Sequence, residues 1–225
     1  MVTSSATPLW IRSARIAFGV LGVVALLWIP LRNLDVETFS TANYFSYFTI
    51  ESNVLGVVVL LVGGVLDPRS RRWQLVRGAA TLYLVITGVV YAVLLADIDV
   101  MLTDRWINDV LHRVLPIVLL VDWLLVPAGL IAGLRLVGLW LIYPVVYGAY
   151  TLVRGPIVDW YPYPFIDPRG QGYVSMALGL VVLVVVFALL AVAVAALGGL
   201  LGGWIGLSRN QDGKAVSSDN TASAP

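Results

Sequence analysis

The sequence predicts an all-α fold: a polytopic membrane helix bundle with six transmembrane helices and both termini on the cytoplasmic side. Three observations lead to it. Hydrophobic residues make up 60% of the chain and charged residues 12%, against roughly 25% charged in soluble domains. Apolar runs of about 20 residues, the length that crosses a bilayer, recur along the chain. Arginines gather in alternate connecting segments, as the positive-inside rule requires.

Each expected helix is an apolar run bounded by breaks that contain Pro, Gly and charged residues. The runs leave no room for a separate soluble catalytic domain, so residues 1–207 are expected to form a single transmembrane domain. The six spans are expected near residues 11–31, 43–66, 75–96, 108–128, 133–153 and 172–205.

The first and last runs need separate comment. A cleaved signal peptide is the alternative for the first run, but no small-residue cleavage site follows it, which favours a retained span. The last run is too long for one simple crossing and too short for two. It is expected to tilt, emerge or bend near glycines that let another helix approach closely. These glycines are Gly198, Gly199, Gly202 and Gly203.

Orientation follows from nine basic residues, which fall on one side of the predicted bundle, whereas Arg32, Arg105, Arg154 and Arg169 fall on the other. The side with the nine should be cytoplasmic, in the plasma (inner) membrane, while the opposite loops are acidic or balanced. Residues 208–225 are rich in Ser, Asn, Asp, Gly and Ala and are expected to form a disordered cytoplasmic tail. The nine basic residues are Arg12, Arg15, Arg69, Arg71, Arg72, Arg77, Arg135, Arg209 and Lys214.

Composition also limits the kinds of catalytic and binding site that the chain can form. The chain has no cysteine and one histidine, which excludes disulfides, thiol nucleophiles and a multi-histidine metal centre within one chain. No cofactor or metal is therefore predicted. A net charge of +1 argues against nucleic-acid binding, which needs a concentrated basic face. Membrane lipids are the expected partners, and the sequence indicates no oligomeric state.

Polar residues inside the spans are the candidates for function, because such residues are costly in hydrocarbon. At about 1.5 Å per residue, Thr49 lies roughly six residues inward from the outer boundary, Tyr91 roughly five and His112 roughly four, with Arg154 at the edge. All four therefore belong to the outer third, where one outward-opening polar pocket would satisfy them. The further candidates for supporting or substrate-contacting roles are Asn53, Thr87, Asp109, Arg113 and Tyr147.

These residues also have structural interpretations. Thr49 could bond to the carbonyl four residues earlier, as membrane threonines often do. His112 suits a general base because its intrinsic pKa is near neutrality, but it could equally be a hydrogen-bonding post. Asp109 and Arg113 are expected to pair at four-residue spacing. Two other acidic residues, Glu51 and Asp122, receive no role in the pocket. For Asp122, pairing or capping near the cytoplasmic helix ends is an alternative.

The outer loop from Arg154 to Tyr173 is rich in proline and aromatic residues, including Asp159-Trp160-Tyr161-Pro162-Tyr163-Pro164-Phe165. Prolines cannot continue a helix and aromatic rings settle at the membrane interface. The segment should lie flat over the outer mouth of the bundle. It is interpreted either as a lid over an acyl-chain site or as an interfacial spacer.

A set of motifs together resembles a bacterial family of uncharacterised six-span membrane proteins. The motifs are YFSYFTIESN (44–53), WINDVLHRVLP (106–116), DWL (122–124), Tyr143-Pro144 followed by Arg154-Gly155, and WYPYPF (160–165). That family distantly resembles the androgen-induced membrane proteins of animals, which are threonine-dependent hydrolases of fatty acid esters of hydroxy fatty acids. The resemblance covers nearly the whole chain. By position, Thr49 resembles the threonine of the animal enzymes and His112 their histidine.

The leading hypothesis is therefore a membrane-embedded esterase. His112 takes the proton from Thr49, whose oxygen attacks a fatty acyl ester presented from the outer leaflet. Asn53, Tyr91 or Arg113 could donate to the oxyanion, and Asp109 is a candidate to orient the imidazole.

Two alternatives remain open at this stage. The first is a small-molecule or proton-coupled transporter that uses Glu51, Asp122, His112 and Arg113. The second is a non-catalytic lipid-binding membrane protein. Polar groups that reach both faces of the bundle would favour transport, whereas a blind apolar chamber at the outer side would favour lipid chemistry.

Overall fold

The structure, a computed structural model, describes residues 6–95, 104–131 and 133–222, and it describes side chains as far as Leu201. Throughout these residues the regular secondary structure is helical, which confirms the all-α fold. The helices are α1 (Leu9–Arg32), α2 (Thr41–Phe45), α3 (Phe48–Val65), α4 (Arg71–Val90), α5 (Arg105–Asp109), α6 (Leu115–Leu125), α7 (Leu134–Val158) and α8 (Pro168–Ala222). Two π-helical turns, η1 (Tyr91–Leu95) and η2 (Val110–Val114), and one 3-10 turn, η3 (Pro164–Ile166), complete the set.

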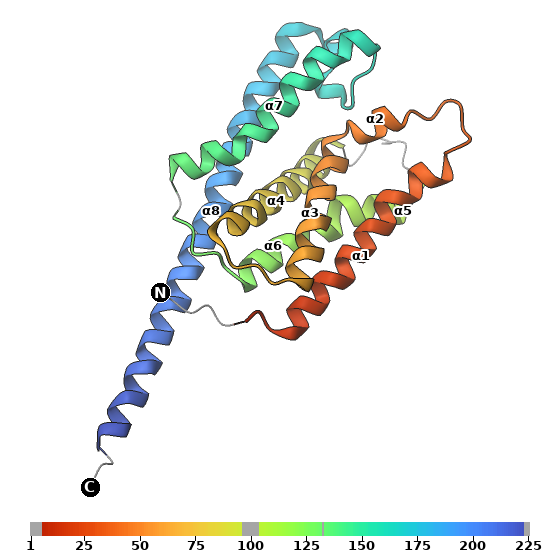
Figure 1. Ribbon diagram of the computed structural model, residues 1–225. Helices are drawn as coiled ribbons and strands as arrows, with labels where there is room; N and C mark the ends of the chain where they lie inside the picture. Colours follow the sequence, from red (N-terminus) through yellow and green to blue (C-terminus); the bar gives the residue numbers. More distant parts are fainter. Residues whose placement is uncertain (1–5, 96–103, 132, 223–225) are drawn as a thin grey trace.

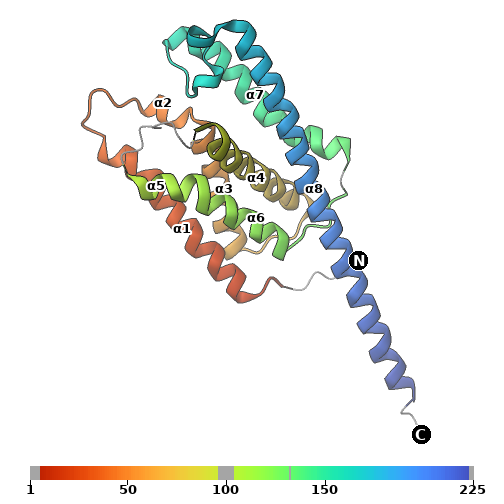
Figure 2. The same ribbon diagram turned by 180° about the vertical axis from the view of Figure 1, so that it is seen from behind.

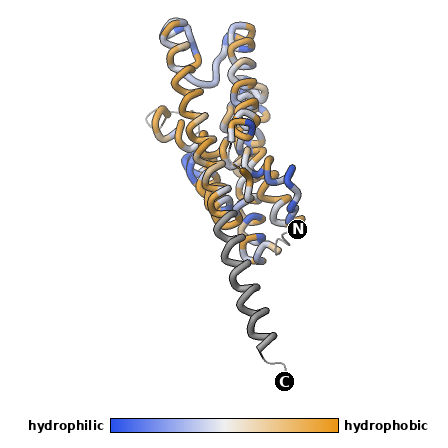
Figure 3. The backbone as a smooth tube through the Cα atoms, turned by 90° about the vertical axis from the view of Figure 1, so that its left-hand side faces the viewer, coloured by the Kyte–Doolittle hydropathy of each residue, from blue (hydrophilic) through white to orange (hydrophobic). Residues whose placement is uncertain are grey.

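Five helices within the described residues are long and apolar enough to cross a membrane. They are Leu9–Arg32, Phe48–Val65, Arg71–Leu95, Leu134–Val158 and Pro168–Leu201. Hydrophobic residues cover most of the length of these helices (Figure 3). The chain is thus an integral membrane protein. The run Arg105–Leu125, where another span is predicted, is continuous helix divided by the turn η2 into shorter pieces.

The helices form two groups (Figures 1 and 2). Helices α1, α3, α4 and α6 pack into one bundle, in which α3 contacts both α1 and α4, and α4 contacts α6. Helices α7 and α8 lie beside each other, and α8 also contacts α4 and α6. Side chains attach α7 to the bundle: Trp140 donates from Nε1 to the Leu75 carbonyl at 3.0 Å, and its own carbonyl accepts from Tyr83 at 2.8 Å.

Small residues set the closest helix contacts. A Cβ added to Gly22 of α1 would lie 2.4 Å from Cγ2 of Val57 in α3. A Cβ added to Gly198 of α8 would lie 2.5 Å from Cζ2 of Trp123 in α6. The prediction that Gly198 permits close approach of another helix is therefore confirmed, in keeping with the role of small residues between membrane helices.

The bend of α8 lies elsewhere than predicted. Gly198 and Gly199 continue the helix, whereas Gly172 near its beginning has φ 79° and ψ 157°. A positive φ is readily adopted only by glycine, which lacks a Cβ, so the chain turns there into its last span. Residues 208–222 lie within the bounds of α8, their side chains lie outside the described set, and the disordered tail stays a prediction.

A buried charge cluster joins α1, α4 and α6. Asp122 of α6 accepts hydrogen bonds from Arg15 Nε at 2.6 Å and from Arg77 Nε at 3.0 Å. All three side chains are at most 7% exposed. The pairing expected for Asp122 is thereby confirmed. Arg15 also donates to the Gly63 carbonyl at 3.2 Å, which extends the cluster to α3.

Removal of this carboxylate should destabilise the protein. In Asp122→Asn, Arg77 stays buried without a carboxylate partner and Arg15 keeps only Asp67, at 3.9 Å, and loss of a buried partner typically costs about 3–5 kcal/mol. The free energy of unfolding, measured by denaturant titration in a fixed detergent, should fall by that amount. Asp109→Asn is the matched control: it breaks the exposed pair with Arg113 and should cost about 0.5 kcal/mol or less. Equal effects of the two substitutions would contradict this account.

Candidate functional site

The site begins at the start of α3. Helix α2 ends at Phe45 and α3 begins at Phe48, so Thr49 lies in the first turn of a new helix and has no carbonyl of that helix four residues behind it. Its Oγ1 instead lies 3.3 Å from Nε2 of His112. Both side chains are buried, with Thr49 at 7% and His112 at 5% exposure. The structure thus brings together the two residues that the sequence predicts as the central pair.

Hydrogen bonds define the protonation pattern of the pair. Nδ1 of His112 lies 3.1 Å from the main-chain carbonyl of Asn108. A carbonyl can only accept, so Nδ1 carries a proton, and in the neutral imidazole Nε2 then presents a lone pair toward the hydroxyl of Thr49. Asp109, the candidate for orienting the imidazole, is instead paired with Arg113 at 2.6 Å. The orienting group is the Asn108 carbonyl, which no sequence pattern singles out.

Two π-helical turns position the histidine. Tyr91 begins η1, His112 lies in η2, and their rings stack with centroids 4.3 Å apart. The Tyr91 hydroxyl accepts from Nδ2 of Asn108 at 2.5 Å. Such turns widen a helix by one residue and are frequent at functional sites. Tyr91 therefore holds the face of the imidazole and is not directed at Thr49.

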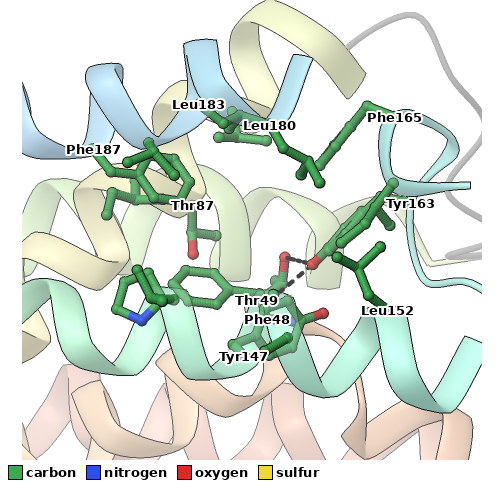
Figure 4. A pocket seen from close by; sticks show the side chains of 18 of the residues that line it. Phe48, Thr49, Thr87, Tyr147, Leu152, Tyr163, Phe165, Leu180, Leu183 and Phe187 are labelled. Atoms are coloured by element: carbon green, nitrogen blue, oxygen red, sulfur yellow. Dashed lines mark hydrogen bonds between the residues drawn. The ribbon is translucent and has the colours of Figure 1, made fainter. Parts of the chain in front are cut away.

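The proline-rich segment between α7 and α8 supplies a further group. Tyr163 is buried, and its hydroxyl lies 3.3 Å from Thr49 Oγ1 and accepts from the Thr49 N–H at 3.2 Å. Figure 4 shows these two contacts as dashed lines. Tyr163 was absent from the sequence-derived candidates. The only available signal was its place in the WYPYPF motif, because a loop side chain carries no helical spacing that predicts its partner.

A pocket of about 290 Å³ adjoins Thr49. Its wall comes from α3, α4, α7, α8 and the segment before α8, and Figure 4 shows the lining side chains. The described lining residues are uncharged, and their polar groups belong to Thr49, Thr87, Tyr147 and Tyr163. Val145 of α7 and Val184 of α8 line the pocket and are 55% and 49% exposed. The pocket therefore opens sideways between α7 and α8, onto the surface that faces lipid.

The other polar candidates of the spans mostly bind helices together. Asn53 donates from Nδ2 to the carbonyls of Thr49 at 2.8 Å and Leu111 at 3.1 Å. Thr87 lines the pocket and donates to the Tyr83 carbonyl at 3.0 Å. Because its amide protons are committed to carbonyls, Asn53 is not placed to stabilise an oxyanion, contrary to the sequence-based expectation.

Tyr147, Arg113 and Arg154 each have partners other than the pair. The hydroxyl of Tyr147 accepts from the Phe48 N–H at 3.1 Å and donates to the Ser46 carbonyl at 2.9 Å. Arg113 is exposed and paired with Asp109, as its spacing predicts. Arg154 donates to Asn43 Oδ1 at 2.7 Å and lies over the ring of Trp160.

Among the described residues, no group of three or more His, Cys, Asp or Glu side chains converges on a point that could hold a metal. Comparisons of the chain with protein-family models, curated protein sequences and solved structures found no significant match. The family resemblance indicated by the motifs consequently stays a prediction.

The pocket is expected to take up an acyl chain. In lipid nanodiscs that contain a photoreactive fatty acyl lipid, irradiation should label Ile86 or Thr87, which line the pocket and are 1% and 4% exposed. Gly148→Trp should reduce this label at least about fivefold, because Gly148 lines the pocket with open space at its Cβ position and an indole would occupy that space. Mass spectrometry of the digested protein locates the label.

Gly138→Trp is the matched control. Gly138 belongs to the same helix and also has open space at its Cβ position, but it does not line the pocket. Label on Ile86 or Thr87 that is insensitive to Gly148→Trp would show that the chain reaches them by another route.

Proposed function

We propose that this protein is a membrane-embedded esterase that hydrolyses fatty acyl esters, with Thr49 as nucleophile and His112 as general base. One observation carries the proposal: the 3.3 Å contact between Thr49 Oγ1 and Nε2 of His112, placed where Thr49 faces an apolar pocket. A threonine hydroxyl is a weak nucleophile unless a base within hydrogen-bond reach accepts its proton.

The reaction would proceed in two halves. His112 Nε2 accepts the proton of Thr49 as Oγ1 bonds to the ester carbonyl carbon, and the collapsing tetrahedral intermediate expels the alcohol, which takes the proton from His112. Water then attacks the acyl-threonine while His112 again accepts a proton, and the acid and free Thr49 are released. The Asn108 carbonyl, 3.1 Å from Nδ1, stabilises the imidazolium formed in each half.

The pocket supports an acyl chain as the group that is bound. Its described lining is uncharged and largely aliphatic or aromatic, and its opening between α7 and α8 would let a chain enter from the membrane. A volume of about 290 Å³ is near the lower end of ligand pockets, about 300–1,000 Å³. His112 is not among the lining residues and meets the pocket at Thr49, whose Oγ1 lies 3.3 Å from Nε2.

The contacts of Asp122 and Glu51 weigh against the transport alternative. Asp122 is neutralised by Arg15 and Arg77, and Glu51 accepts a hydrogen bond from Tyr143. Neither carboxylate adjoins the Thr49–His112 pair among the contacts of the described residues. Groups that are held in ion pairs and hydrogen bonds serve structure more readily than ion passage, which requires a connected polar path.

Substitution of either residue of the pair should abolish hydrolysis. Thr49→Ala removes the nucleophile and His112→Ala the base, and each should lower kcat/KM for a fatty acyl ester by about 10²–10⁴-fold or more. Thr81→Ala is the matched control, because Thr81 is a buried threonine whose hydroxyl bonds only to the Arg77 carbonyl. The assay measures release of fatty acid from a panel of lipid esters, including acyl esters of hydroxy fatty acids.

Helix content and melting temperature would establish that each variant is folded. A folded wild-type protein without activity on the panel, or variants as active as the wild type, would exclude the esterase and leave lipid binding without catalysis.

We further propose six spans, with Arg105–Leu125 as the fourth, and both termini on the cytoplasmic side of the plasma membrane. Arg105–Leu125 is continuous helix and predominantly apolar after Arg113. An even number of spans returns the chain to the side on which it started, and the arginine-rich segments would then all face the cytoplasm.

Single cysteines test this topology directly, because the chain has none of its own. In intact cells a membrane-impermeant maleimide should label Thr38→Cys, between α1 and α2. It should label Ala6→Cys, Ser70→Cys and Ser217→Cys only after the membrane is permeabilised. Labelling of Ser217→Cys from outside while Ala6→Cys stays protected would indicate an odd number of spans.

A further inference from the structure

Four hydroxyl groups line the pocket, and their hydrogen bonds differ in one respect. Thr49 faces the acceptor Nε2 of His112. Thr87 donates to the Tyr83 carbonyl and lies 2.9 Å from Ser52 Oγ, and Tyr147 donates to the Ser46 carbonyl. The hydroxyl of Tyr163 accepts from the Thr49 N–H and contacts Thr49 Oγ1. Of the four, Tyr163 is the one whose proton is neither given to a main-chain carbonyl nor directed at the base.

We propose that Tyr163 is a catalytic residue, whose O–H donates the hydrogen bond that stabilises the oxyanion formed when Thr49 attacks an ester carbonyl. This proposal rests on the esterase function proposed above. As Oγ1 bonds to the carbonyl carbon, the π electron pair moves onto the carbonyl oxygen and the Thr49 proton moves to His112. Tyr163 keeps its own proton and shares it with that oxygen until the carbonyl re-forms.

The geometry suits this role. In the tetrahedral intermediate, the oxyanion and Thr49 Oγ1 are bonded to the same carbon and are therefore close together. The Tyr163 oxygen lies 3.3 Å from Oγ1, so its O–H is near the oxyanion as well. A point about 3 Å from both the nucleophile and a donor is what the chemistry requires. The sequence-derived donors do not offer one. Asn53 bonds two carbonyls, Arg113 pairs with Asp109, and the Tyr91 ring stacks on the imidazole.

The segment around Tyr163 holds the donor in place. The ring stacks on Phe165 with centroids 5.1 Å apart, and meets Tyr47 edge-on at 5.6 Å. Arg169 joins the two ends of the segment through Asp159 at 2.5 Å and Asp167 at 2.7 Å. A donor fixed before the reaction pays no reorganisation energy during it.

Burial keeps this donor protonated. Removal of the phenol from water raises the pKa of Tyr163 to about 12, because the charged phenolate would be poorly solvated. At neutral pH the group is therefore a neutral O–H donor.

Tyr163→Phe tests the proposal by removal of one oxygen atom. The variant keeps the ring that contacts Phe165 and Tyr47, and its kcat for a fatty acyl ester should fall by about 10²–10³-fold, the usual effect of loss of one oxyanion donor. KM should change less than about threefold, because the bond forms only in the transition state. Initial rates over a range of substrate concentrations in nanodiscs, together with melting temperatures, give both quantities.

Two controls separate the hydroxyl from the packing. Tyr47→Phe and Tyr161→Phe each remove a phenol oxygen near Tyr163 and keep the ring, and the Thr49 contacts of the described residues involve neither hydroxyl. Both should retain kcat within about threefold of the wild type. Either variant being as impaired as Tyr163→Phe would overturn the proposal and assign the effect to closure of the segment.

The remaining outcomes are equally decisive. If Thr49→Ala and His112→Ala are inactive while Tyr163→Phe keeps the wild-type kcat, the esterase stands and this inference fails. A rise in KM without loss of kcat, or failure of Tyr163→Phe to fold, would also overturn it, since the hydroxyl would then serve binding or structure. An inert wild type would remove the esterase and the role of Tyr163 together.

Discussion

Helix α3 begins inside the apolar bundle, and the N–H groups at that start need partners that water cannot supply there. Helix starts leave such donors unpaired by their own helix, and an unpaired group in hydrocarbon costs several kcal/mol. Phe48 and Thr49 donate to the hydroxyls of Tyr147 and Tyr163. The interruption at residues 46–47 thus brings α7 and the segment before α8 to the same point of α3. The pocket and the pair at its wall depend on this arrangement.

Ionisable side chains inside the bundle likewise need partners, because charges are costly in hydrocarbon. Asp122 lies between two arginines from different helices, and its cluster joins α1, α4 and α6 on the side opposite the pocket in the predicted orientation. Glu51 is held by Tyr143 of α7. With the ionisable groups of the bundle bound in this way, the pocket wall contains hydroxyls as its polar groups among the described residues. The His112 imidazole, which adjoins Thr49 of this wall, is a base next to hydroxyl groups.

The bundle helices and the helices α7 and α8 have different roles in the site. Helices α3 and α4 and the turns η1 and η2 carry Thr49, Thr87, Tyr91 and His112. Asn53 joins α3 to η2 through the Leu111 carbonyl, Ser52 of α3 contacts Thr87 of α4 at 2.9 Å, and the Tyr91 ring of η1 stacks on His112 of η2. Helices α7 and α8 contribute mainly the apolar wall and its opening. The reactive pair is therefore held by the tightly packed bundle, whereas the surface that meets lipid belongs to the peripheral helices.

The sequence by itself determined the helical membrane fold, the approximate bounds of the apolar runs, the Asp109–Arg113 pair and the candidacy of Thr49 and His112. These depend on hydropathy over about 20 residues and on spacing within one helix, which are properties of neighbouring residues. Only the tertiary structure decided that Thr49 meets His112 at 3.3 Å, that the Asn108 carbonyl orients the imidazole and that Tyr163 reaches Thr49. It also placed the bend of α8 at Gly172. Such contacts join residues far apart in the chain, and the packing of side chains between helices, which no local pattern encodes, selects them.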